Sequence, residues 1–333
     1  MIEVKGLTKK YGTHTAVNNI SFSIEEGKIY GFLGPNGAGK STTMNMITGC
    51  ISATDGEVLI NGHDIFNEPL EAKKNIGYLP EIPPLYVDFT VREYLKFVCE
   101  LKKVPAASVK DEVNRVIEES NTQEYADRLI RSLSKGYRQR VGLAQALIGD
   151  PAIIILDEPS IGLDPKQIIE MRELIRGLGQ KHTVILSSHI LSEVSAVCDH
   201  ILIIRKGELV ANGTPEELAK NLASSSQLVV DVIGNKETVT NALSDIDAAI
   251  EISDGDEDGA LHVTLKTQEK SDLREQVSRK LSAEGCIILG MQLTHASLED
   301  VFLELTDQEE NTSDTSSDVT DDSDVADEKK EVA

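Results

Sequence analysis

Short apolar runs alternate with helix-length amphipathic segments over the first two thirds of the chain. Apolar runs bounded by turn residues predict β-strands, and apolar residues recurring at helical spacing predict helices. The expected strands are 2–7, 16–24, 28–33, 57–61, 76–80, 152–156, 182–187 and 200–205; the expected helices are 40–48, an interrupted stretch 91–120, one starting near 135, 165–178 and 191–196. This alternation predicts an α/β fold with a mainly parallel sheet and helices on its faces.

A second pattern follows a boundary expected near 219–226. Strands are predicted at 227–233, 248–253, 260–267 and 286–293, and helices at 236–244, 271–283 and 298–306. This βαββαβ order with a trailing helix predicts a small α+β domain of the ferredoxin-like type. The last segment is Ser, Thr, Asp and Glu with little to bury, which predicts disorder. We therefore expect three parts, residues 1–221, 222–306 and 307–333.

Charge and cysteine usage narrow the class of protein. The formal net charge is −23; residues 307–333 hold eleven of the 56 acidic and two of the 33 basic residues, which leaves −14 for the remainder. This acidity disfavours nucleic acid as a partner. Cys50, Cys99, Cys198 and Cys286 lack metal-ligand spacing and are expected to be reduced thiols. No apolar run approaches the roughly 18 residues that span a bilayer, so any membrane role would come through a partner.

A glycine-rich stretch, GPNGAGKST, stands between an expected strand and an expected helix. It fits the pattern G-x-x-x-x-G-K-[ST], whose backbone N–H groups surround nucleotide phosphates. In such a loop Lys40 reaches the β- and γ-phosphates and Ser41 ligates Mg²⁺. The predicted nucleotide-binding residues here are Gly34, Pro35, Asn36, Gly37, Ala38, Gly39, Lys40, Ser41 and Thr42.

Acidic residues end the apolar strand in AIIILDEPS. Asp157 is placed to hold the metal through water, and Glu158 to act on the attacking water. Taken alone, the pattern equally fits a strand ending in solvated acids. His189, in SSHIL, follows another strand where open α/β sheets bind ligands, and we expect it to sense the γ-phosphate. The other histidines are expected to be structural: His14, His63, His182, His200, His262 and His295.

A second anion-binding helix start lies about ninety residues after the first, in SLSKGYRQRVGLAQAL. Ser134 suits the N-cap, and Gly136 allows close approach of the backbone, so hydroxyl and N–H donors would converge on a γ-phosphate. The simpler reading is a capped, basic surface helix. A single chain cannot use both helix starts on one nucleotide.

The order and spacing of Tyr11, GPNGAGKS, YLPE, LSKGYRQR, IIILDEPS, GLDP and SSHIL resemble the ATP-binding-cassette (ABC) subunits of membrane transporters. The resemblance covers residues 2–217. It implies the P-loop NTPase cassette fold for residues 1–221, with ATP and Mg²⁺ as cofactors. It also implies a head-to-tail dimer, in which the LSKGYRQR helix of each cassette meets the ATP held by the other.

The same resemblance assigns further residues. Tyr11 corresponds to the aromatic residue that stacks on adenine, and Asp164, in GLDP, to a position near the dimer interface. Glu81 stands where the family usually has a Gln that reaches the metal and water, and is expected to be a metal ligand. Lys135 and Tyr137 stand where the commonest family form has Gly and Gln.

The stretch HASLEDVFLELT resembles the C-terminal extension of ABC-2 exporter cassettes, including those of gliding motility, sodium efflux and drug export. We therefore expect the ATP-hydrolysing subunit of a bacterial ABC-2 exporter. Its partners would be a second cassette, identical or paralogous, and a polytopic membrane permease. It would be cytoplasmic and peripheral on the inner face of the cell membrane. Segment 82–102, with Pro83, Pro84, Leu85, Tyr86 and Phe89, suits either docking to that permease or buried helix packing.

Two functions other than export are compatible with a cassette of this kind. A soluble cassette acting on ribosomes or DNA is disfavoured, because the chain has one cassette, no heptad insertion, no paired cysteines and an acidic composition. A soluble regulatory ATPase not coupled to transport stays open, because the ferredoxin-like fold hosts many functions.

Overall fold

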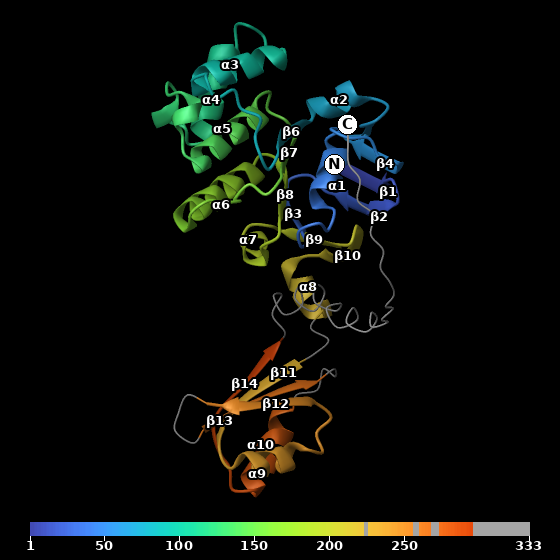
Figure 1. Cartoon of the computed structure of the whole chain (residues 1–333), viewed down its shortest axis with the longest axis vertical. Coiled ribbons are helices and arrows are strands. Elements are labelled where there is room, and N and C mark those ends of the chain that lie inside the picture. The colour runs from blue at the N-terminus through green and yellow to red at the C-terminus, as the bar shows by residue number, and fades with distance from the viewer. Residues whose placement is uncertain (223–225, 256–259, 268–272, 296–333) are drawn as a thin grey trace, which may run out of the picture.

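The computed structural model describes residues 1–222, 226–255, 260–267 and 273–295, which form two sheets in the first part of the chain and one in the second (Figure 1). The helix expected at 298–306 and the acidic segment 307–333 lie outside the described residues. The boundaries expected at 221/222 and 306/307 stay predictions.

The central sheet has the order β10-β9-β3-β8-β7-β6. Its strands are β3 (Ile29–Leu33), β6 (Ile76–Leu79), β7 (Ile153–Leu156), β8 (Thr183–Ser188), β9 (His200–Arg205) and β10 (Glu208–Gly213). All neighbours pair in parallel except β9 and β10. The expected mainly parallel sheet is therefore confirmed, and the carboxyl ends of its parallel strands meet at one edge, where such sheets bind ligands.

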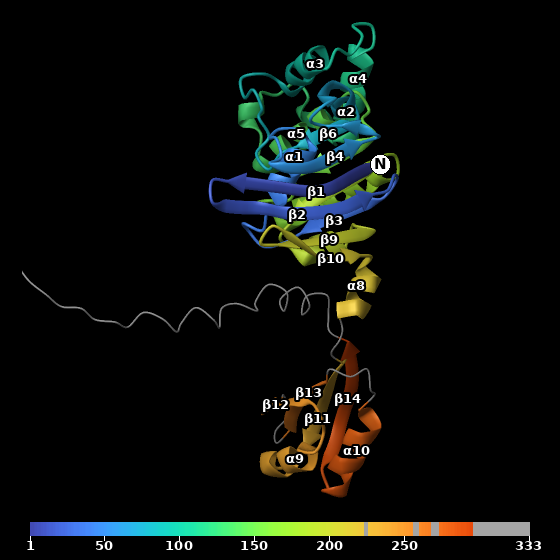
Figure 2. The same cartoon turned by 90° about the vertical axis from the view of Figure 1, so that its right-hand side faces the viewer.

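The first strands of the chain form a separate antiparallel sheet of order β2-β1-β4-β5. Its strands are β1 (Ile2–Tyr11), β2 (His14–Ile24), β4 (Asp55–Ile60) and β5 (His63–Asp64). The pattern of apolar runs does not distinguish these strands from those of the central sheet. The local reason is the two-residue link after β1, where Gly12 has a φ of 60° and Tyr11 pairs with His14. Strands joined by so short a turn pair antiparallel, and Figure 2 shows β1 and β2 running side by side.

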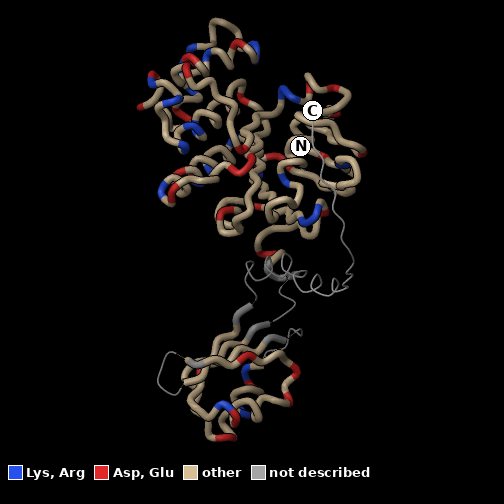
Figure 3. The backbone as a smooth tube through the Cα atoms, in the orientation of Figure 1, with Lys and Arg blue, Asp and Glu red and all other residues tan. Residues whose placement is uncertain are grey.

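The first part contains all the helices expected from the sequence and two further short ones, 69–74 and 215–222, that were not predicted. The helices are α1 (Lys40–Ile47), α2 (Pro69–Lys74), α3 (Val91–Leu101), α4 (Val109–Glu119), α5 (Lys135–Leu147), α6 (Pro165–Gly179), α7 (Leu191–Ser195) and α8 (Pro215–Leu222), with 3₁₀ turns η1 (Gln123–Tyr125) and η2 (Ile130–Ser132). The interrupted stretch expected at 91–120 is resolved into α3 and α4. In Figure 3 acidic and basic residues are interspersed along these helices.

Two apolar cores lie on opposite faces of the central sheet. Alternate residues of β7 show this, because Ile154 and Leu156 belong to the core shared with α3 to α6, whereas Ile153 and Ile155 belong to the core shared with α1 and the antiparallel sheet. Every residue of β7 is buried. A strand covered on both faces is typical of parallel sheets, and it explains why this segment is a continuous apolar run.

Strand β10 was not predicted. Its residues alternate between exposed and partly buried positions, so its apolar pattern is weak. The signal was the Lys206-Gly207 pair, whose φ values of 48° and 81° form the link between β9 and β10. Two consecutive residues with positive φ are typical of a two-residue hairpin.

The second part of the chain has the expected βαββαβ order. Its elements are β11 (Ser226–Ile233), α9 (Lys236–Leu243), β12 (Ala249–Asp254), β13 (Ala260–Thr267), α10 (Arg274–Ala283) and β14 (Ile287–His295). The antiparallel sheet has the order β12-β13-β11-β14, which is that of the split βαβ motif. Val230 and Val263 pack with Val239 of α9 and Val277 of α10 in its core.

The cysteines differ sharply in accessibility. Cys50 is exposed, whereas Cys99, Cys198 and Cys286 are buried. Burial raises the pKa of the Cys99 thiol to about 11 and also raises that of Cys198. Since the thiolate is the reactive form, we expect one of the four thiols of the native protein to react rapidly with a chromogenic disulfide reagent at pH 8. Cys50→Ser should remove this fast phase, and a fast phase of two or more thiols would contradict the structure.

Candidate functional site

The glycine-rich loop Gly34–Thr42 connects the carboxyl end of β3 to the start of α1. Two of its glycines are required by their surroundings. A Cβ on Gly34 would lie 2.3 Å from the carbonyl oxygen of Ile204, and Gly39 has a φ of 105°, with its Cβ position 2.6 Å from the carbonyl of Ala16. Backbone contact and a left-handed conformation thus exclude larger residues, which gives the loop the tight path of a phosphate cradle.

Lys40 is directed back over this loop rather than toward bulk solvent. It is 5% exposed, and its Nζ donates to the carbonyl oxygens of Gly34 over 2.8 Å and Pro35 over 3.2 Å. The ammonium also lies 3.3 Å from Oε1 of Glu158. A buried lysine requires such partners, so its positive charge is fixed within the cradle.

The two acids that follow β7 are held by the end of the neighbouring strand β8. The hydroxyl of Ser187 donates to Oδ1 of Asp157 over 2.6 Å and accepts from the backbone N–H of Glu158 over 2.9 Å. Ser41 donates to the same Oδ1 over 3.2 Å. Burial, reinforced by the charge of Asp157, raises the pKa of the nearby Tyr78 phenol. Asp157 is therefore joined to the cradle through Ser41.

Glu158 has an unusual backbone and contacts both Lys40 and His189. Its φ of 48° lies in the left-handed region, which non-glycine residues rarely adopt. One carboxylate oxygen faces Lys40, and the other lies 2.9 Å from Nδ1 of His189. Backbone strain of this kind gathers at functional sites. The sequence-predicted Glu158 and His189 are thus brought into direct contact.

Lys40, Ser41, Glu158 and His189 line one groove of about 660 Å³, which we call the P-loop groove, and Asp157 is not among its lining residues. It is lined by Tyr11, His14, Ala16, Asn36, Gly37, Gly39, Lys40, Ser41, Thr42, Glu81, Glu158, Ile161 and His189. Tyr11 and Glu81, placed here by resemblance alone, are among them. Three lining residues were not predicted: Ala16, Ile161 and His14, the last of which was expected to be only structural. The feature of the sequence that could have placed His14 in the groove is its position three residues after Tyr11.

The second helix start lies apart from this groove. Ser134 is the N-cap of α5 and accepts from the N–H of Tyr137 over 3.4 Å, and the first turn of α5 has no acidic residue. Asp164 caps α6 and accepts from Gln167 over 2.9 Å. A Cβ on Gly136 would lie 2.6 Å from that Gln167 side chain, so the two helix starts are neighbours. Ser134, Gly136 and Asp164 do not line the P-loop groove.

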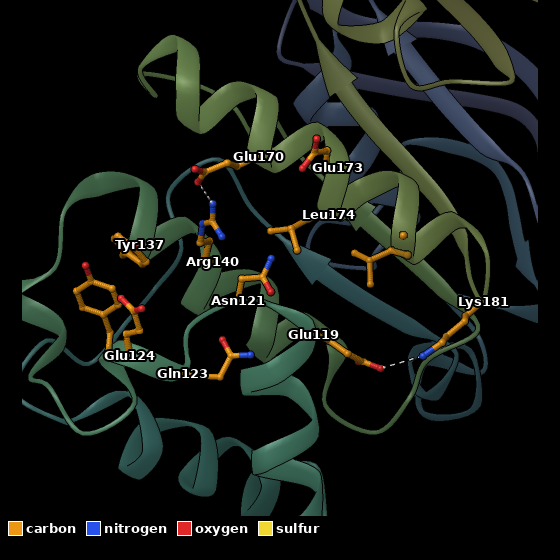
Figure 4. A pocket seen from close by; sticks show the side chains of 13 residues that line it. Glu119, Asn121, Gln123, Glu124, Tyr137, Arg140, Glu170, Glu173, Leu174 and Lys181 are labelled. Carbon is orange, nitrogen blue, oxygen red and sulfur yellow. Dashed lines mark hydrogen bonds and ion pairs between the residues drawn. The ribbon is translucent and has the colours of Figure 1, made fainter.

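Tyr137 packs against an aromatic ring and an arginine. Its ring centroid lies 3.9 Å from that of Tyr125, and Cζ of Arg140 lies 5.6 Å from it. The hydrogen bond with Tyr125 raises the pKa of Tyr137, and burial adds to this. These rings form one wall of a hollow of about 600 Å³ between α5, η1 and α6, where Arg140 pairs with Glu170 (Figure 4). Tyr137 therefore anchors the start of α5 to η1.

The fold and the site together define the class of protein. A phosphate loop after a parallel strand, with a lysine, a serine and two acids at the same sheet edge, is the arrangement of a P-loop nucleoside triphosphatase.

Comparison with known proteins gives the family. Residues 17–161 match the family described as ABC transporter. The chain is 34% identical over 317 residues to the bacitracin transport ATP-binding protein BcrA of Bacillus licheniformis, covering 92% of this chain and 97% of that one. It is 32% identical over 311 residues to the linearmycin resistance ATP-binding protein LnrL of Bacillus subtilis, covering 92% and 98%. The chain belongs to the ATP-binding proteins of ABC transporters.

Solved structures agree with this family. The structure of an ATP-binding subunit of an ABC transporter matches with a TM-score of 0.60 and 29% identity, covering 66% of this chain and 92% of that one. A dimeric, post-hydrolysis cassette, MJ0796 bound to ADP and Pi, matches with a TM-score of 0.59 and 25% identity, covering 64% and 98%. The expected cassette fold and ATP-hydrolysing activity are confirmed. Among the helices in the described residues, none is both long and apolar enough to cross a membrane.

Proposed function

We propose that this chain is the ATP-hydrolysing subunit of an ABC-2 exporter, acts as a head-to-tail dimer and drives a separate membrane subunit. The observation that carries the proposal is the separation of two anion-binding helix starts, that of α1 inside the P-loop groove and that of α5 outside it. The α1 start can bind ATP within its own chain, whereas the α5 start can contribute only to an ATP site that a second cassette holds.

The donors at the sheet edge fit Mg²⁺. The Ser41 hydroxyl and Asp157 carboxylate, 3.2 Å apart, are the hard oxygen ligands that this ion prefers. The described residues include no cluster of three or more His, Cys, Asp or Glu suited to a metal. That agrees with an ion that keeps waters and substrate oxygens as its other ligands. When bound, Mg²⁺ would neutralise charge on the phosphates, and Glu81 in the same groove is a further candidate ligand.

Hydrolysis is assigned to the residues around Glu158. Lys40 binds the β- and γ-phosphates, and Glu158 orients the attacking water and accepts its proton. His189, bonded to Glu158 through Nδ1, contacts the γ-phosphate side of the site. Tyr11, 51% exposed in the same groove, offers its ring to adenine.

The α5 start would complete the ATP site of the partner cassette. Ser134 and the first N–H groups of α5 supply hydroxyl and backbone donors, and Gly136 leaves the approach open. Asp164 caps the neighbouring helix and would lie at the interface. The dimeric state of the solved cassette that holds ADP and Pi supports this arrangement.

An exposed apolar strip follows Glu81 and is proposed to contact the membrane subunit. Ile82 is 82% exposed, Tyr86 56% and Phe89 39%, whereas Leu85 packs against the helical core. The sequence allowed either buried packing or an exposed docking surface for this segment. Leu85 is packed against the core, whereas Tyr86 and Phe89 are exposed. Exposed apolar patches of this kind mark protein contacts.

Export, which we propose to take place from the cytoplasmic face, is supported as a function by the names of the relatives. Those that match over nearly their whole length include bacitracin transport, linearmycin resistance and Nod factor export ATP-binding proteins. These matches extend into the second part of the chain, where residues 222–306 are proposed as the accessory domain. The alternative of a regulatory ATPase without transport is not favoured by them, and the net charge of −23 disfavours nucleic acid.

The proposal is tested by affinity purification of the tagged Glu158→Gln chain with Mg-ATP from detergent-solubilised membranes of its native cells. We expect a polytopic membrane protein to be recovered with it. Tyr86→Ser with Phe89→Ser in the same background should lose this protein while ATP binding is retained. Recovery of soluble partners alone, with the chain absent from membranes, would contradict the exporter function.

A further inference from the structure

A buried carboxylate that the hydrolysis proposed above does not use lies beside the loop of His189. Glu193, in the short helix α7, is only 7% exposed. Its Oε2 accepts hydrogen bonds from two hydroxyls, those of Ser160 and Ser188, the latter over 3.3 Å. A carboxyl group is costly to bury unless it is hydrogen-bonded, so both serines stabilise its position.

The two serines belong to different loops of the site. Ser160 lies two residues after Glu158 and starts the turn that leads to Asp164. Ser188 ends β8 directly before His189; its hydroxyl accepts from the N–H of Ile190 over 3.0 Å, and its carbonyl accepts from the N–H of Gly34 over 3.4 Å. Glu193 therefore links the loop after β7 to the loop after β8 and, through Ser188, to the phosphate cradle.

The same two loops are also joined on the groove side by the contact of 2.9 Å between His189 and Glu158. Both bonds are partly buried, and each has a carboxylate acceptor that is 7% exposed. Two bridges between the same loops fix their relative position better than one. The bond between Ser160 and Glu193 would keep Glu158 and His189 aligned even when substrate displaces the contact between them.

We propose that Glu193 is a positioning residue for ATP hydrolysis, which holds the 160–164 turn and His189 as one unit through Ser160 and Ser188. This inference rests on the roles proposed above for Glu158 and His189. The proposed role of Glu193 depends on its carboxylate as a hydrogen-bond acceptor, because the hydroxyls of both serines donate to the same oxygen, Oε2. A Gln amide oxygen can accept the same two bonds, whereas Leu accepts none.

The test compares Glu193→Leu, Glu193→Gln and Ser160→Ala in the full chain, with kcat and KM for Mg-ATP and the melting temperature measured for each. We expect Glu193→Leu to lower kcat by about 10- to 100-fold with KM little changed, because small misplacements of catalytic groups cost up to about 10²-fold. Glu193→Gln should keep kcat within about 3-fold of the native chain. A threefold change in rate corresponds to less than half of the activation free energy of a tenfold change. Ser160→Ala should lower kcat, and adding it to Glu193→Leu should cost little more.

Three results would overturn the inference: an unchanged kcat in Glu193→Leu, a loss in Glu193→Gln as large as in Glu193→Leu, or full additivity of the two changes. If Glu193→Leu does not fold, Ser160→Ala decides alone, since it leaves the bond from Ser188 in place: a lower kcat at an unchanged melting temperature supports the inference, and an unchanged kcat overturns it. Native-like kcat in all Glu193 variants, with hydrolysis still dependent on Glu158, would sink this inference alone. Hydrolysis that does not depend on Glu158 would sink the proposed mechanism as well.

Discussion

Replacing Glu158 with Gln is expected to slow ATP hydrolysis by about 10²- to 10⁴-fold, the usual contribution of a general base. Gln keeps the size of the side chain and one acceptor oxygen, but it cannot take a proton from the attacking water. Glu158 is placed for that task, because its carboxylate lies between Lys40 and His189 at the phosphate cradle.

ATP binding should survive this change. Lys40 loses its ion partner but keeps its hydrogen bonds to the carbonyls of Gly34 and Pro35, so the cradle keeps its charge and shape. Phosphate release measures the loss of kcat, and a fluorescent ATP analogue measures binding. With Mg-ATP the variant should elute as a dimer of two 36.3 kDa chains. Glu173→Gln, on α6 and away from the P-loop groove, is the matched control and should change neither quantity. Equal losses of binding and hydrolysis would exclude the assigned role.

Lys40→Met is expected to weaken ATP binding by about 10- to 100-fold, since hydrogen bonds to charged groups contribute about 1.5–3 kcal/mol. Methionine fills the same space without a charge for the phosphates. The same change leaves the Glu158 carboxylate, 7% exposed, without its cation. Removing one partner of a buried ion pair costs about 3 kcal/mol or more, so the midpoint of urea unfolding should fall.

The double variant Lys40→Met with Glu158→Gln separates these two effects. It removes the uncompensated carboxylate, so we expect most of the lost stability to return while ATP affinity stays low. Unfolding midpoints and binding titrations of the native, single and double variants complete the comparison. An affinity of the Lys40→Met chain close to the native value would show that this lysine does not hold the phosphates.

The sequence alone was sufficient to predict features whose residues are contiguous in the chain. Gly34–Thr42 forms a loop whose spacing is set by local geometry, and Asp157 and Glu158 follow a run of apolar residues that only a buried strand explains. Their meeting follows from the parallel sheet, because the ends of β3 and β7 share an edge. Fold class and most of the cradle were therefore predictable.

Features that depend on distant partners were not predicted. The bond between Ser160 and Glu193 joins residues 33 positions apart, and the ring contact joins Tyr125 to Tyr137 across a turn. No local pattern encodes either. The separation of β1 and β2 from the central sheet was missed for a similar reason, because strand propensity gives the existence of a strand and not its neighbours.

Strand β7 is apolar on both faces, so burial alone does not set its alignment within the sheet. A slide of one residue would exchange Ile154 and Ile155 between the two cores with little change in burial. The N–H groups of Ile153 and Asp157 donate to the backbone carbonyls of Asn75 and Leu79, bonds that any alignment could form. The bond that the Asp157 carboxylate accepts from the Ser187 hydroxyl over 2.6 Å depends on two particular side chains and is specific to this alignment. Asp157, which is proposed to bind the metal, thus also keeps β7 from sliding in the sheet. Replacing Asp157 should therefore impair folding as well as ATP hydrolysis.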